Sequence, residues 1–262
     1  MVALFSERVF FDTAPAVRRI SAADLRWALA EGWRDFKDMR GDVLALAFVY
    51  PVGGILASLL LLNESLAPLM FPLVAGLAIL GPAVASGFFE LARRRDAGEE
   101  AGWSHFLDPF RRASRDPLMA LSLMLAVLFS AWIAAAWALY SVTVGPAAPA
   151  SAAELFRLAL TTPAGWTLIV AGGLIGFVFA AVTLVVSLVS FPMVVDRRAD
   201  ALTAVAASLR ACARNPGPVA AWGLTIAVVL TIACIPLFAG LVVALPVLGY
   251  ASWRLYTRLV EH

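Results

Sequence analysis

The side chains most able to do chemistry gather in one stretch of the chain, residues 90–108. Carboxylates and a histidine lie there beside three consecutive arginines, and such groups could act together as general acids and bases. The acidic and imidazole side chains are Glu90, Asp96, Glu99, Glu100, His105 and Asp108. Acidic groups among arginines are usually ion pairs of low energy, and Glu90 lies one helical turn before Arg93 and Arg94. We therefore expect Glu90 to pair with these arginines, and a membrane-embedded enzyme is the least favoured hypothesis.

The sequence has few residues that could hold a metal or a cofactor. Its two histidines are His105 and His262, whereas haem and zinc sites need several converging ligands. A catalytic haem–copper oxidase subunit is excluded for the same reason. We expect no metal, no cofactor and no catalytic residues. The two cysteines, Cys212 and Cys234, are interpreted as small packing residues.

Long uncharged stretches dominate the chain. It has 262 residues, of which 62% are hydrophobic and 15% are charged. A run of about 18 or more apolar residues can cross a bilayer as a helix. We therefore expect an all-α fold, a polytopic transmembrane helix bundle of about six spans in three hairpins. The expected spans are 43–62, 66–91, 117–144, 164–195, 218–235 and 237–256.

The last apolar stretch is divided at Pro236. Proline removes a helical hydrogen bond and clashes with the preceding turn, so a helix is expected to break there. A single tilted or kinked helix over 218–256 is the alternative.

The basic residues predict an orientation. On this map 19 of the 20 lie on one side of the membrane, and Arg157 is the exception. Positively charged loops stay in the cytoplasm, so both termini are predicted to be cytoplasmic, which requires an even number of spans. Lys37 is the only lysine, and this arginine bias is typical of a GC-rich bacterial genome, hence of a bacterial inner membrane.

Residues 1–20 have the pattern of a mobile tail and not of a signal peptide, and 21–262 are expected to form a single membrane domain.

Three cytoplasmic segments have the pattern of a short amphipathic helix before each hairpin. Their expected apolar faces are Leu25, Leu29, Trp33 and Phe36, then Trp103, Phe106, Leu107 and Phe110, and last Leu202, Val205, Leu209 and Cys212. They end at Arg40-Gly41-Asp42, Arg115-Asp116-Pro117 and Arg214-Asn215-Pro216. Ser21 and Asp24 resemble a capping box at the first helix. Two interpretations stay open: the helices lie in the lipid head-group region, or they are loops pressed against the bundle.

A known family shares several of these motifs. The stretch from Gly81-Pro82 to Phe88-Phe89-Glu90-Leu91-Ala92-Arg93-Arg94, followed by Gly102-Trp103, resembles a bacterial family of predicted integral membrane proteins, domain of unknown function 2189. Trp33-Arg34-Asp35-Phe36 and Phe191-Pro192-Met193 also fit. The resemblance extends over roughly residues 20–258. It implies a multi-spanning protein and carries no established activity, so it transfers no catalytic residues.

Two functions remain in view. The favoured one is a non-enzymatic accessory or assembly partner of another membrane complex. Its expected partners are the lipid bilayer and another membrane protein or anionic lipid head groups, and no nucleic acid. The alternative is a transporter or channel for a neutral or apolar solute, since broken helices can line a binding site. Gly172 and Gly176 form a small-xxx-small pair that indicates close helix packing. The residues expected to contact the membrane surface or a partner are Trp33, Phe36, Arg40, Glu90, Arg93, Arg94, Trp103, Phe106 and Arg115.

Overall fold

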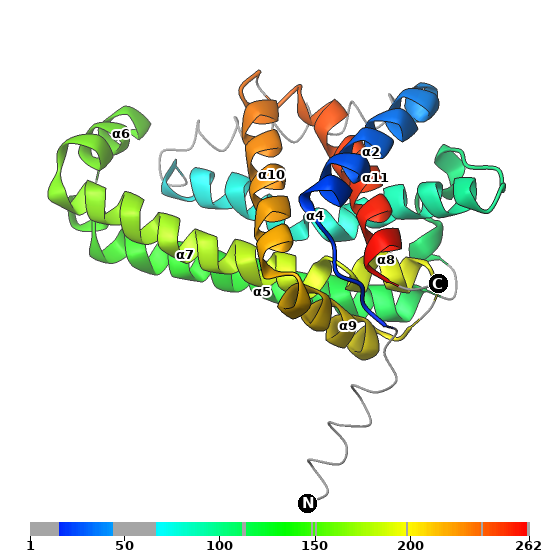
Figure 1. Cartoon of the computed structure of the whole chain (residues 1–262). Coiled ribbons are helices and arrows are strands. Elements are labelled where there is room, and N and C mark those ends of the chain that lie inside the picture. Colours follow the sequence, from blue (N-terminus) through cyan, green and yellow to red (C-terminus); the bar gives the residue numbers. More distant parts are fainter. Residues whose placement is uncertain are drawn as a thin grey trace, which may run out of the picture. The chain divides into compact units, whose positions relative to one another are not determined.

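The computed structural model of the chain describes residues 16–43, 67–111, 114–147, 149, 151–197, 199–236 and 238–260 (Figure 1). All the regular elements in these ranges are helices, which confirms the all-α fold class for the described residues. The α-helices are α2 (Ala22–Val43), α4 (Ala67–Asp96), α5 (Arg115–Val142), α6 (Ala152–Thr161), α7 (Pro163–Ser187), α8 (Ser190–Val195), α9 (Ala201–Arg214), α10 (Pro216–Cys234) and α11 (Leu241–Leu259). Short 3-10 helices are η3 (Trp103–His105), η4 (Asp108–Phe110) and η5 (Gly145–Ala147).

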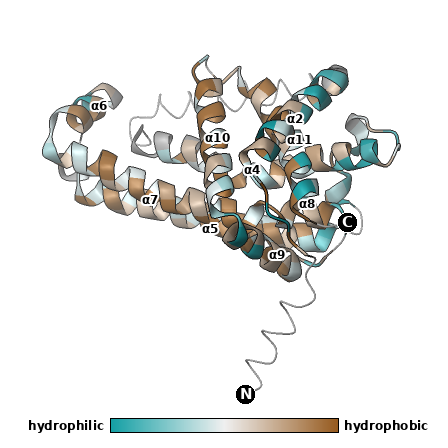
Figure 2. Ribbon diagram, in the orientation of Figure 1, coloured by the Kyte–Doolittle hydropathy of each residue, from teal (hydrophilic) through white to brown (hydrophobic). Residues whose placement is uncertain are grey.

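Three stretches of helix are long and apolar enough to cross a membrane within the described residues. They are Arg115–Val142, Pro163–Val195 and Pro216–Cys234. Figure 2 shows how apolar residues dominate α5 and α7 along their length. The first expected span, 43–62, lies almost wholly outside the described residues. Apolar membrane helices are therefore confirmed, and the count of six spans stays a prediction.

The expected division at Pro236 is confirmed as a break between helices. Helix α10 ends at Cys234 and α11 begins at Leu241. Phe238 in the connection has a φ of 65°, a left-handed conformation that a helix cannot contain. The C-terminal part of α11 is buried against α2, its main neighbour.

The fourth expected span, 164–195, corresponds to the apolar stretch Pro163–Val195. The helix is interrupted at Leu188 and Val189, after which α8 begins at Ser190. Neither residue is a glycine or proline, so the local sequence gave no sign of the interruption. All six residues of α8 are buried.

Two of the three segments that were expected to be cytoplasmic amphipathic helices also differ from expectation. Helix α2 continues through Gly41 to Val43, because one glycine costs a helix only about 1 kcal/mol. The second segment forms the turns η3 and η4 in place of an amphipathic α-helix, with Pro109 at the start of η4. A proline cannot donate the backbone hydrogen bond that a continuing α-helix would need there.

Side chains cap several helix starts, among them those of α2 and α9. Asp24 accepts hydrogen bonds from the backbone N–H and the hydroxyl of Ser21, at 2.9 and 2.8 Å, as expected of a capping box. These bonds lower the pKa of the Asp24 carboxyl. At α9, the Asp200 carboxylate accepts from the backbone N–H of Thr203 at 3.0 Å. Caps of this kind contribute about 1 kcal/mol each.

The N-terminal segment is fixed at its end. Residues 1–15 of the expected mobile tail lie outside the described residues. Val17 forms an isolated antiparallel bridge with Val260, and the Arg18 N–H donates to the Leu259 carbonyl at 2.8 Å. Residues 17–20 are therefore held against the end of α11 and do not form part of a free tail.

The chain divides into two compact units. Unit 1 comprises residues 1–51, 82–122 and 184–262, and unit 2 comprises 52–81 and 123–183. Among the described residues, every arginine and lysine except Arg157 falls in unit 1. Because α4, α5 and α7 each contribute to both units, the expected single membrane domain stays a prediction.

Trp132 organises the packing within unit 2. Its indole N–H donates to the Pro72 carbonyl at 2.7 Å, and the ring lies edge-on to Phe179 with centroids 5.9 Å apart. A Cβ at Gly176 would meet this ring at 3.3 Å, and one at Gly76 would meet it at 2.7 Å. The expected packing role of Gly176 is thus confirmed: the glycine makes room for a large side chain of a neighbouring helix.

We expect Trp132→Phe to lower the free energy of unfolding by about 1 kcal/mol, because it removes one buried hydrogen bond and keeps a ring in place. Trp137→Phe is the matched control, since this tryptophan lies on the same helix and is half-exposed. Unfolding in mild detergent measures both variants. Equal stability of the two would contradict the role given to the Trp132–Pro72 bond.

Candidate functional site

Helix α2 packs on α11 through small residues. Leu25, Ala28, Gly32 and Asp35 are buried and follow one face of α2. A Cβ at Gly32 would lie 2.6 Å from the backbone nitrogen of Ala251, so only glycine allows this approach. The close contact brings a buried carboxylate, Asp35, to the surface of α11.

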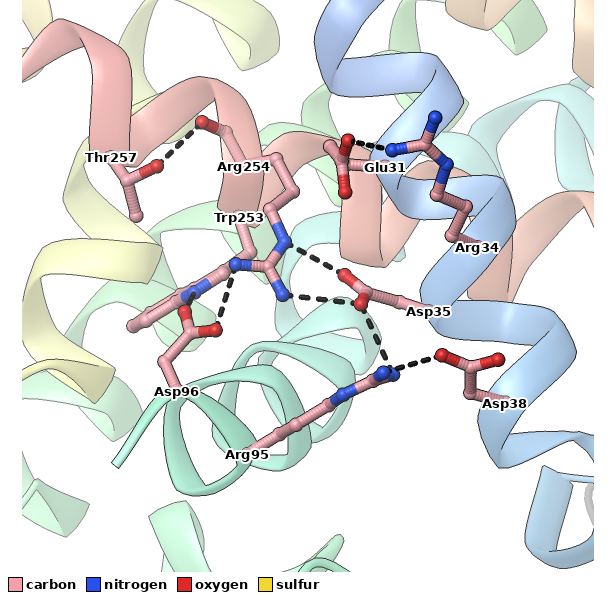
Figure 3. A network of polar contacts seen from close by, with 9 residues as sticks. All are labelled: Glu31, Arg34, Asp35, Asp38, Arg95, Asp96, Trp253, Arg254 and Thr257. Carbon is pink, nitrogen blue, oxygen red and sulfur yellow. Dashed lines mark hydrogen bonds and ion pairs between the residues drawn. The ribbon is translucent and has the colours of Figure 1, made fainter. Parts of the chain in front are cut away.

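Asp35 forms a paired contact with Arg254 of α11 (Figure 3). The guanidinium Nε lies 2.7 Å from Oδ2 of Asp35, and Nη2 lies 3.1 Å from Oδ1. Asp35 is only 4% exposed. A two-pronged contact of this kind is the strongest geometry between arginine and a carboxylate, and it allows the charge to be buried.

Helix α4 completes the ion network. Arg254 also contacts Asp96 at 2.7 Å, and the Trp253 indole N–H donates to the other oxygen of Asp96 at 2.9 Å. Arg95 contacts Asp35 at 3.2 Å and donates to Asp38. This hydrogen bond lowers the pKa of the Asp38 carboxyl. Three helices far apart in the sequence are thus joined by the hub, defined as Asp35, Asp38, Arg95, Asp96, Trp253 and Arg254.

A second cluster surrounds Glu90, which is 2% exposed. Arg93 donates two hydrogen bonds to its carboxylate, at 2.9 and 2.8 Å, and these raise the pKa of the guanidinium. Arg94 lies 3.8 Å from Glu90 and 3.7 Å from Asp108, and donates to the Glu100 carbonyl at 2.7 Å. The expected pairing of Glu90 with Arg93 and Arg94 is confirmed.

Phe106 fixes the loop that follows this cluster. It is buried edge-on against Phe88, with ring centroids 5.0 Å apart. A Cβ at Gly87 would approach its ring to 2.4 Å. Phe106 is therefore a packing residue of unit 1 and is withdrawn from any membrane surface.

Three other expected surface residues complete the comparison. Arg115 is exposed at the start of α5. Arg40 lies in the last turns of α2 and Trp103 in η3, and their side chains lie outside the described residues.

The apolar stripe expected on α2 is not the packing face. Leu25 is buried, Leu29 and Phe36 are half-buried, and Trp33 is 46% exposed. Trp33 and Phe36 contact each other with centroids 5.6 Å apart. Trp33 is therefore left exposed while smaller residues pack on α11, and the expected surface contacts of Trp33 and Phe36 stay predictions.

Helix α9 repeats this arrangement. Its buried residues are small, among them Ala204, Ala207 and Ala211. Leu202 is 66% exposed, and Leu209 is exposed as well. Cys212 is buried, and burial raises the pKa of its thiol to about 11, which suits a packing residue.

Polar side chains of α9 and its end satisfy backbone groups elsewhere in unit 1. The Ser208 hydroxyl donates to the Val185 carbonyl at 2.7 Å and accepts from the Val189 N–H at 3.1 Å, across the interruption between α7 and α8. Asn215 accepts from the Ile20 N–H at 2.9 Å and donates to the Arg18 carbonyl at 3.0 Å. Each side chain replaces hydrogen bonds that the helices or the N-terminal segment lack.

The sequence reasoning missed Asp35 and Arg254 as partners. Asp35 appeared only inside a family motif, and Arg254 only as one of the basic residues that predict the orientation. A signal was present: Asp35 continues the spacing of Leu25, Ala28 and Gly32, so a carboxylate on that face needed a cation. The partner itself is 219 residues away and could not be identified from spacing.

These groups form an ionic framework. Each buried carboxylate of the two clusters, Asp35, Glu90 and Asp108, lies within 4 Å of an arginine. Within the described ranges, no three His, Cys, Asp or Glu side chains are placed to hold a metal ion. The chemistry that this arrangement supports is pairing between helices.

We expect Asp35→Asn to destabilise the protein by roughly 3 kcal/mol, because it leaves two guanidinium groups facing a neutral side chain in a buried position. Asp38→Asn is the matched control on the same helix, since its side chain is 57% exposed and its ion pair is worth little. Denaturant unfolding in detergent measures the difference. A loss no larger for Asp35→Asn than for the control would show that the hub does not hold the three helices together.

Comparisons with known proteins give one match. No curated protein and no solved structure is similar to the chain. A family model, predicted integral membrane protein, domain of unknown function 2189, matches residues 70–196, a shorter range than the resemblance drawn from the motifs. The matched range includes α5 and α7 and the Glu90 cluster. Residues 70–196, a little under half of the chain, are thus similar to that family of predicted integral membrane proteins.

Proposed function

We propose that this chain is a non-enzymatic protein of the bacterial inner membrane that serves as an accessory or assembly partner of another membrane protein. The observation that carries the proposal is the pairing of the buried acids: Asp35, Glu90 and Asp108 all lie beside arginines. Carboxylates used in this way stabilise a fold and are poorly placed to move protons. In the proposed role, the protein therefore acts through helix surfaces that contact a partner protein.

The apolar helices offer such surfaces. In unit 2, Leu174 and Phe177 of α7 are 64% and 72% exposed. In unit 1, Leu224 and Ile232 of α10 are also exposed. Inside a bilayer, apolar faces of this kind contact lipid or the helices of a partner, and association depends on packing.

The distribution of charge supports an orientation with both termini in the cytoplasm. The described basic residues lie in unit 1 apart from Arg157, which lies on α6. Loops rich in arginine stay on the cytoplasmic side. The basic side would also favour anionic lipid head groups.

A transporter for a neutral or apolar solute is the second candidate, favoured by the interruptions after Ser187 and Cys234. Broken helices line substrate sites in many transporters. Here Ser208 already occupies the Val185 carbonyl and the Val189 N–H, which supports the accessory role instead. Flux of small neutral solutes into vesicles reconstituted with the chain would favour a transporter over the accessory role.

The orientation is tested with single cysteines in a Cys212→Ala, Cys234→Ala background. We expect Ala153→Cys, on α6, to react with an impermeant maleimide in intact spheroplasts, because it lies between two apolar helices on the side poor in arginine. Ala97→Cys, in the loop after α4, should react only after permeabilisation. Labelling of both positions in intact spheroplasts, or of neither before permeabilisation, would overturn the orientation.

The accessory role is tested by deleting the gene in the native host and comparing membrane complexes. We expect one complex to fall in abundance and to recover on expression of the wild-type chain. A photo-cross-linker at Phe177 should give a discrete adduct with a subunit of that complex, whereas one at the buried Trp222 should not. Purification of the chain alone, with unchanged complexes in the deletion strain, would remove the proposal.

A further inference from the structure

One flank of α2 combines an exposed tryptophan with two cations. Arg26, Trp33 and Lys37 are all exposed, and their spacing of seven and four residues places them in one row along the helix. The row is separate from the buried face of Ala28, Gly32 and Asp35. We call these three residues the interfacial row.

The cations of the row form no ion pair within 4 Å in the described part of the chain, although the charge of Lys37 contributes to lowering the pKa of the neighbouring Asp38 carboxyl. Arg26 forms no ion pair there, and the neighbour of Lys37, Asp38, is already bonded to Arg95. Arg34 differs, because it contacts Glu31 on the same helix (Figure 3). Acidic groups of unit 1 are thus largely occupied by buried or bridging arginines, while the row keeps its positive charge.

The composition of the row identifies its partner. Tryptophan prefers the boundary between head groups and hydrocarbon, and basic residues beside it attract anionic lipid. The row runs from Arg26 to Lys37, a rise of about 17 Å along the helix, and is one side chain wide. A stable protein interface needs about 800 Å² on each partner, far more than such a row offers. Lipid head groups can bind it one by one.

We propose that the interfacial row of α2 binds anionic phospholipid head groups of the cytoplasmic leaflet. Trp33, in contact with Phe36, enters the boundary region, and Arg26 and Lys37 contact phosphate groups on either side of it. The inference rests on the proposed orientation, which places α2 in the cytoplasm. Helix α2 can then pack on α11 with one face and bind lipid with another.

In the test, the full-length chain in mild detergent is mixed with equimolar phosphatidylglycerol and phosphatidylcholine and is then purified again. Native mass spectrometry counts the lipids retained. We expect wild-type protein to retain phosphatidylglycerol preferentially, and Arg26→Gln/Lys37→Gln to lower that preference by about tenfold or more. Lys37→Gln alone should lower it, and Lys37→Arg should keep it. Trp33→Ala should lower retention of both lipids.

Arg34→Gln is the matched control, because it removes one positive charge from the same helix at a position paired with Glu31. An equal loss in Arg34→Gln and Lys37→Gln, or no loss in the double variant, would overturn the proposal. So would an acidic protein that co-purifies with the wild type and not with the double variant, in the absence of any lipid preference. Gel filtration and unfolding of each variant confirm that it is folded.

Failure of this inference is distinguishable from failure of the proposed function. The maleimide labelling of Ala97→Cys and Ala153→Cys reads orientation without regard to lipid preference. A lost lipid preference with unchanged labelling would remove the interfacial row alone. Labelling that reverses the orientation would remove the cytoplasmic assignment even if the row binds anionic lipid.

Discussion

The buried contact between Arg254 and Asp35 is the interaction on which the charged side of this protein depends. A guanidinium in a largely buried position is costly unless carboxylates surround it, and here Asp35 and Asp96 do so at 2.7 Å. These carboxylates come from α2 and α4, so the two helices must meet α11 at one point. Further contacts hold α11 to this part of the chain, since Val17 pairs with Val260 and Arg258 lies 4.1 Å from the Trp27 ring.

The same requirement governs the backbone. A peptide group without a hydrogen bond costs several kcal/mol in a bilayer, so an interrupted helix needs partners from outside itself. Ser208 supplies them between α7 and α8, and Trp132 supplies one to Pro72 within unit 2. At the break between α7 and α8, a side chain of the protein itself thus satisfies the backbone groups that the interruption leaves without partners. That feature favours a structural role for the prolines and breaks.

Helices α2 and α9 reverse the usual arrangement of an amphipathic helix. Their packing faces consist mainly of glycine, alanine and serine, whereas Trp33, Leu202 and Leu209 point outward. Small residues allow helix axes to approach closely, as Gly32 does at Ala251. In water such outward apolar residues would be a liability, whereas the proposed position beside a membrane would make them favourable contact surfaces. Packing and surface contact are thereby assigned to different faces of one helix.

The sequence by itself determined the class of protein. Long apolar runs, the basic residues gathered in a few loops, the break at Pro236 and the Ser21–Asp24 cap all follow from properties of single residues and their neighbours. The ion pairs of Glu90 with Arg93 and Arg94 were also within reach, because they lie within one turn of a helix.

Only the tertiary structure decided which face of each helix is buried and which charges meet. Hydrophobic periodicity marks large apolar residues, but close packing selects small ones, and Asp35 is buried because Arg254 arrives from 219 residues away. The interruption at Val189 likewise depends on Ser208, a residue of another helix. Local sequence does not contain such partners, since the free energy of burying a charge or a free peptide group is set by whatever the fold brings beside it.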